Sequence, residues 1–83
     1  PLPQALAVIE TLTSPGGCQW IHPGSRHWNL TAELCRLTRT VGKSVSDASH
    51  AALAIEHGGT WVSRDSDFER FIVHGLRWEQ WEP

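Results

Sequence analysis

The 83-residue chain is long enough for one small domain, and a chain of this size buries only about 60% of the surface that its unfolded form exposes. Its apolar content of 40% and charged content of 19% exclude a disordered protein, and its formal charge of −2 excludes a basic nucleic-acid-binding arm. Two cysteines are too few for a disulfide framework, so we expect a reduced cytoplasmic protein, and no stretch approaches the length of a membrane span.

The first elements expected along the chain are a helix and a short strand. Residues 2–13 carry apolar side chains at helical spacing, and the S-P-G-G sequence at 14–17 ends this helix. The sequence C-Q-W-I-H at 18–22 is a strand candidate, with Trp20 assigned to the core.

A second helix is predicted to follow Ser25, whose hydroxyl is suited to cap it, and to end at Gly42. Trp28 in its first turn is assigned to the core. The apolar residues at helical spacing are Leu30, Leu34, Leu37 and Val41. Three cations are spaced to lie along one side of this helix, as the best candidate for an RNA-binding patch or, alternatively, as a solvated helix face: Arg36, Arg39 and Lys43.

A third helix is predicted from a cap at Ser46 to about His57. Its inner face consists of Ala48, Ala51, Ala52 and Ile55. Small residues on that face indicate close packing against a neighbouring element. Gly58-Gly59 supplies a left-handed end to the helix, and T-W-V-S at 60–63 is predicted to be a buried strand with Trp61 in the core.

The C-terminal part of the sequence predicts a helical turn at 67–71 and an extended segment at 75–81. Helices that alternate with short apolar strands are typical of an α/β fold with a parallel sheet. A right-handed crossover carrying both long helices would then join strands 18–22 and 60–63.

Asp47 and Asp65 are predicted to meet at one corner of this fold. A helix of about 11 residues carries the chain about 17 Å away from Asp47, and Gly58-Gly59 reverses it. The following strand returns roughly 16 Å. Both carboxylates should therefore lie at the C-terminal edge of the strand, where open α/β sheets usually bind ligands.

Helix capping is the alternative explanation for these acids. Asp47 in a first helical turn interacts favourably with the helix dipole. Ser66 and Glu69 form the capping box S-x-x-E, which assigns the capping role to Ser66 and leaves Asp65 without one. On these grounds a site and a pair of caps both remain open.

One long stretch carries a resemblance to a known family. V-S-D-A-S-H-A-A-L-A-I-E-H-G-G-T-W-V-S-R-D-S-D-F-E-R-F at 45–71, with R-H-W at 26–28 and G-L-R-W at 75–78, resembles the C-terminal half of a PIN-domain protein of the VapC toxin family. The match is strong over 25–78. It implies a partial PIN-like, Rossmann-like three-layer fold with a short parallel sheet, in which 1–83 form a single truncated domain lacking the N-terminal strand and helices.

The resemblance also implies a chemistry: a Mg²⁺- or Mn²⁺-dependent ribonuclease toxin that a VapB-type antitoxin holds inactive. In that family four acids surround the metal. By matching position Asp47 and Asp65 are the third and fourth acids, catalytic and metal-binding, and Asp67 is a nearby metal ligand. Hard divalent ions bind oxygen ligands and can activate water for attack on an RNA phosphodiester.

The departures from the family pattern concern the other two acids. The family's first acid lies in a D-T-S or D-T-N strand and its second is a Glu in a later helix, and neither has a convincing counterpart here, since Glu10 is the only acid before Glu33. The sequence F-I-V-H-G-L-R-W at 71–78 also has two more residues than the family pattern. We therefore expect weak metal binding and little or no cleavage by this chain alone.

Two other hypotheses belong to different classes. The chain could be a non-catalytic PIN-derived module that forms a homodimer or higher oligomer, or binds the antitoxin, through an exposed sheet edge and its tryptophans. It could also be a small zinc domain. The zinc ligands would be Cys18, His22, His27 and Cys35. Their spacing matches no common zinc finger, and Cys35 lies in the apolar register of its helix, which favours a buried thiol. His50, one turn after Asp47, is a further candidate to line a metal pocket or contact RNA, with a surface or partly buried position as its alternative.

Overall fold

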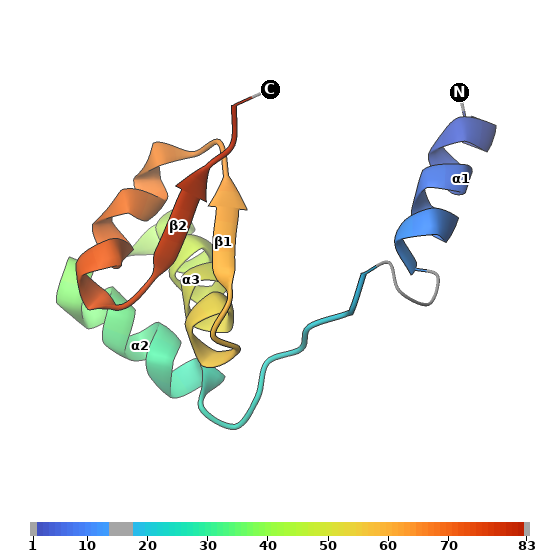
Figure 1. Cartoon of the computed structure of the whole chain (residues 1–83). Coiled ribbons are helices and arrows are strands. Elements are labelled where there is room, and N and C mark those ends of the chain that lie inside the picture. The colour runs from blue at the N-terminus through green and yellow to red at the C-terminus, as the bar shows by residue number, and fades with distance from the viewer. Residues whose placement is uncertain (1, 14–17, 83) are drawn as a thin grey trace.

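The computed structural model describes residues 2–13 and 18–82 (Figure 1). Figure 1 shows the two strands lying side by side over one helix, a second helix beside that one, and the first helix apart from this body. The elements in chain order are α1 (Leu2–Thr13), α2 (His27–Thr38), the short 3-10 helix η1 (Gly42–Ser44), α3 (Val45–Glu56), β1 (Thr60–Ser63), the 3-10 helix η2 (Ser66–His74) and β2 (Arg77–Gln80). None of the described helices is long and apolar enough to cross a membrane.

The sheet of the described residues has two parallel strands, with Trp61 opposite Trp78. This confirms the predicted α/β class and the parallel sheet. The strand at 60–63 and the helix before it also lie where the sequence places them. Gly58 adopts a φ of +67°, the left-handed conformation that ends α3 and reverses the chain into β1.

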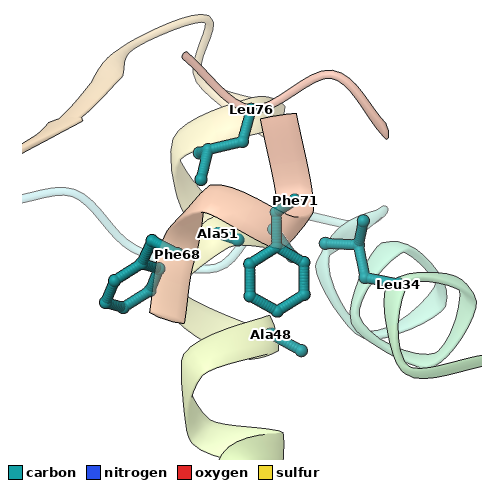
Figure 2. Close-up of a cluster of buried hydrophobic side chains, with 7 residues drawn as sticks. Leu34, Ala48, Ala51, Phe68, Phe71 and Leu76 are labelled. Atoms are coloured by element: carbon teal, nitrogen blue, oxygen red, sulfur yellow. The ribbon is translucent and has the colours of Figure 1, made fainter. Parts of the chain in front are cut away.

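The core lies between α3, α2 and η2. Figure 2 shows Phe68 and Phe71 of η2 beside the alanines of α3, with Leu34 of α2 next to them. Ala48, Ala51 and Ala52 are fully buried, because methyl side chains let the neighbouring elements approach α3 closely. The helical spacing of small residues therefore predicts this face correctly. Ile55 is only partly buried against the same cluster.

The predicted strand at 18–22 is wrong, and the crossover built on it is wrong as well. Residues 18–24 form no regular structure, and Trp20 is 78% exposed. The parallel partner of β1 is β2, which follows it through η2. A short apolar run becomes a strand only where another strand offers hydrogen-bond partners, and in the described part of the chain none lies beside 18–22.

The boundaries of α2 differ from the prediction at both ends. Arg26 occupies the N-cap position instead of Ser25. The helix ends at Thr38, and Arg39 adopts a left-handed φ of 55°. The cations at 36, 39 and 43 therefore do not share one helical side.

The burial of α2 also differs. Trp28 is 67% exposed. Leu37 and Val41 are also exposed, at 53% and 80%. His27 is buried in their place, with its ring Nε2 3.1 Å from Ser49 Oγ on α3. The buried side of α2 is thus rotated toward His27, Thr31 and Leu34.

Two further expectations for α3 and β1 need correction. Ser46 lies inside α3, where its hydroxyl donates to the carbonyl of Lys43, so it is not the cap. β1 is covered on one face only: Trp61 and Ser63 are partly buried, whereas Val62 is 53% exposed.

Candidate metal centre

Three aspartates converge where α3 begins and β1 ends. Asp47 lies in the first turn of α3, Asp65 lies two residues after the end of β1, and Asp67 lies in the first turn of η2. One carboxylate oxygen from each lies within 4.8 Å of the others. The descending helix and returning strand therefore bring positions 47 and 65 together, as the geometric argument predicts. Their role as metal ligands stays a prediction.

Asp65 has a capping role that the sequence analysis assigned to Ser66. Its Oδ1 accepts a hydrogen bond of 2.9 Å from the backbone N–H of Asp67, at the N-cap position of η2. Its own N–H donates to Ser63 Oγ at 3.1 Å. These two bonds fix the turn between β1 and η2. A carboxylate has a second oxygen, so capping and cation binding by Asp65 are compatible.

Arg70 is the cation beside this cluster. Its Nη2 lies 3.7 Å from Asp47 Oδ2. Its guanidinium carbon lies 4.7 Å from the centre of the Phe71 ring. Sequence reasoning missed this pair, because the two residues belong to different helices and no local motif joins them.

An open cleft adjoins the cluster. Its volume is about 370 Å³, and it is lined by Ser66, Asp67, Glu69 and Arg70. Asp67 and Arg70 thus face both the cleft and the aspartate cluster. A ligand in the cleft would lie next to any cation that the aspartates hold.

His50 and the proposed zinc ligands do not join the cluster. His50 is exposed and its ring stacks on Trp61 at 5.0 Å, which agrees with a surface position. His57 Nε2 lies 2.8 Å from the carbonyl of His22. Among the described residues, the one group with metal-ligand geometry is the aspartate cluster, so the zinc hypothesis is not supported there. Neither Glu10 nor Glu33 belongs to that group.

The donor set fits a hard divalent cation. All three candidate ligands are carboxylates, which suit Mg²⁺ or Mn²⁺ and lack the thiolate and imidazole ligands typical of structural zinc. Asp65 and Asp67 are exposed and Asp47 is partly buried. The cluster is therefore accessible from solvent, and the positive charge of Arg70 offsets part of its negative charge.

The fold and this site agree with what the sequence matches. Residues 17–72 match the family described as PIN domain. The chain therefore belongs to the PIN-domain family, and its short parallel sheet with flanking helices is part of that α/β fold.

Within that family the chain is of the VapC type. Ribonuclease VapC37 of Mycobacterium tuberculosis is 39% identical over 83 aligned residues, which cover 96% of this chain and 56% of that protein. The VapC ribonuclease Mb2897 of Mycobacterium bovis is 34% identical over 89% of this chain and 49% of its own length. Ribonuclease VapC31 of Mycobacterium tuberculosis is 37% identical over 86% of this chain and half of its own length. The chain spans about half the length of these curated relatives.

Proposed function

We propose that this chain carries part of the active site of a VapC-type, metal-dependent endoribonuclease. Asp47 and Asp65 would hold Mg²⁺ or Mn²⁺ as the catalytic carboxylates, and Asp67 would supply a third metal ligand. The observation that carries the proposal is the approach of these three carboxylates to within 4.8 Å. The names of the relatives, which are ribonucleases, supply the substrate class.

Each carboxylate has a distinct task in this proposal. The cation would offset charge on the phosphodiester and activate water. Asp47 would hold it from the rigid first turn of α3, and Asp65 would hold it from a turn that its own cap bond fixes. Asp67 would hold it on the side of the cleft. Three largely exposed carboxylates with an arginine beside them give a weak site, so we expect millimolar affinity and little cleavage by this chain alone.

The test combines Mn²⁺ titration with an RNA cleavage assay. Wild type should bind Mn²⁺ weakly, and Asp47→Asn should lose both the binding and any cleavage. Glu69→Gln is a matched control, because Glu69 lines the adjoining cleft but is not part of the cluster. Equal Mn²⁺ affinity in wild type and Asp47→Asn would refute the metal site. Robust cleavage by the isolated chain would contradict the expected weakness.

The partners proposed with this function are RNA and a VapB-type antitoxin in the cytoplasm. A second candidate is a non-catalytic PIN-derived module that forms a homodimer or higher oligomer or binds the antitoxin. The specific observation in its favour is the uncovered apolar surface: Val62 on β1 is 53% exposed and Leu2 on α1 is 70% exposed. Light scattering at micromolar concentration tests it. Val62→Glu should reduce association, whereas Glu69→Gln on η2, which changes no apolar side chain, is the control. A monomeric wild type would count against this candidate.

A further inference from the structure

Arg70 is the least satisfied charged group near the aspartates. Its Nε and Nη2 are buried and make no hydrogen bond within the described part of the chain. The distance of 3.7 Å to Asp47 Oδ2 is long for a hydrogen bond, so this contact is an ion pair without a formed donor–acceptor bond. Buried guanidinium donors without acceptors are costly. The side chain as a whole is 32% exposed, so a shift of the guanidinium toward the cleft would let these donors reach an anionic oxygen of a ligand.

Packing holds the Arg70 side chain at the junction of the cluster and the cleft. The guanidinium lies over the Phe71 ring, and Phe71 is fully buried. Arg70 also lines the cleft with Ser66 and Glu69. The group is thus positioned by the core, with one side toward Asp47 and another toward the open cleft.

A divalent cation held by Asp47 would be repelled by Arg70. Both are positive, and both would lie beside the same carboxylate. A unit charge a few ångströms from a cation raises the energy of the bound ion by an amount that matters even in water. Once Asp47 turns to the cation, the guanidinium loses its partner while remaining beside the cleft.

We propose that Arg70 is a phosphate-positioning residue controlled by the cation. It neutralises Asp47 in the metal-free chain, lowers the affinity of the cluster for the cation, and binds an RNA phosphate oxygen after Asp47 is taken by the metal. Guanidinium donors suit phosphate because two N–H groups can bind two oxygens. This inference rests on the proposed metal site and adds a regulator of affinity and a substrate contact to it.

The test measures two affinities that should change in opposite directions. Isothermal titration with Mn²⁺ should show about threefold to tenfold tighter binding for Arg70→Gln than for wild type, because a competing charge is gone. Anisotropy of a labelled RNA oligonucleotide in Ca²⁺ should show several-fold weaker binding for the same variant. Arg70→Lys, which keeps the charge, should bind Mn²⁺ nearly as wild type does. Arg70→Met, which keeps apolar contact with Phe71, separates loss of charge from loss of packing.

Arg64→Gln is the matched control. Arg64 adjoins Asp65 and carries the same charge, but its guanidinium lies over Trp81, at 5.8 Å from the ring centre. It should change Mn²⁺ affinity less than the Arg70 variants do. If Arg70→Gln and Arg70→Met bind Mn²⁺ no more tightly than wild type, or bind RNA equally well, the proposal is overturned. Loss of Mn²⁺ binding in Asp47→Asn keeps the metal site itself established in that case, so the two failures are distinguishable.

Discussion

Phe71→Ala tests whether η2 is held on the body by its aromatic side chains. Phe71 is fully buried, and its ring centre lies 6.3 Å from that of Phe68. Truncation of a buried Phe to Ala typically costs about 3–5 kcal/mol. A chain of this length is expected to be stable by about 4–12 kcal/mol in total. The variant should therefore lose about a quarter or more of its stability, whereas Phe71→Leu should lose about 1 kcal/mol.

The consequence reaches the candidate site, because η2 carries Asp67 and Arg70 as well as Phe71. Urea unfolding, followed by tryptophan fluorescence from the partly buried Trp61 and Trp78, measures the free energy of unfolding. Mn²⁺ titration of Phe71→Leu, which should stay folded, reports any loosening of the cluster.

Val73→Ala is the control for that measurement. Val73 lies on the same helix but is 82% exposed, so its truncation should change stability by less than about 0.5 kcal/mol. If Phe71→Ala lost no more than Val73→Ala does, η2 would not be anchored as Figure 2 shows it.

Three further substitutions test single contacts. Glu56 accepts backbone hydrogen bonds from Gly24 and Arg26, and chiefly the bond from Gly24 lowers the pKa of Glu56. A carboxyl whose pKa is lowered in the folded state stabilises the fold at pH values above its ordinary pKa, and this stabilisation is lost as the pH falls through the lowered pKa. Glu56→Gln should therefore flatten the acid side of a plot of Tm against pH. Asp65→Asn should keep the cap of η2 but weaken Mn²⁺ binding, whereas Asp65→Ala should also cost about 1 kcal/mol in urea unfolding. Arg39→Gly should raise stability by about 0.5–1 kcal/mol, because φ at Arg39 is 55°; an unchanged urea midpoint would argue against strain there.

The part of the fold that follows from local sequence is the α3–β1 unit. Alanine spacing gives the buried face of α3, Gly58 gives its end, and the lengths of the helix and strand bring Asp47 and Asp65 together. Each step depends on residues that are close in the sequence. Regular geometry alone then fixes where the chain returns, which is why this corner was predictable without a structure.

The rest depends on contacts between distant residues. The start of α2 is held by Glu56, which lies 32 residues after Gly24 and 30 after Arg26, so a local cap at Ser25 was the wrong expectation. The S-x-x-E pattern favours Ser66 as the cap of η2. Asp65 occupies the N-cap position instead, because the turn after β1 brings its carboxylate to the N–H of Asp67. The apolar pattern alone cannot tell which face of a helix lacks a neighbour. It therefore cannot predict that Trp28 is exposed.

The strand geometry also separates the two candidate functions. Successive side chains along β1 point to opposite faces, so Val62 faces away from the helices while Trp61 and Ser63 face toward them. The aspartate cluster lies beyond Ser63, at the end of the strand. A partner that covers Val62 therefore need not contact the carboxylates. Association that is lost in Val62→Glu while Mn²⁺ affinity stays at the wild-type value would mean that binding and catalysis use different surfaces, and loss of both together would mean that the partner surface supports the metal site.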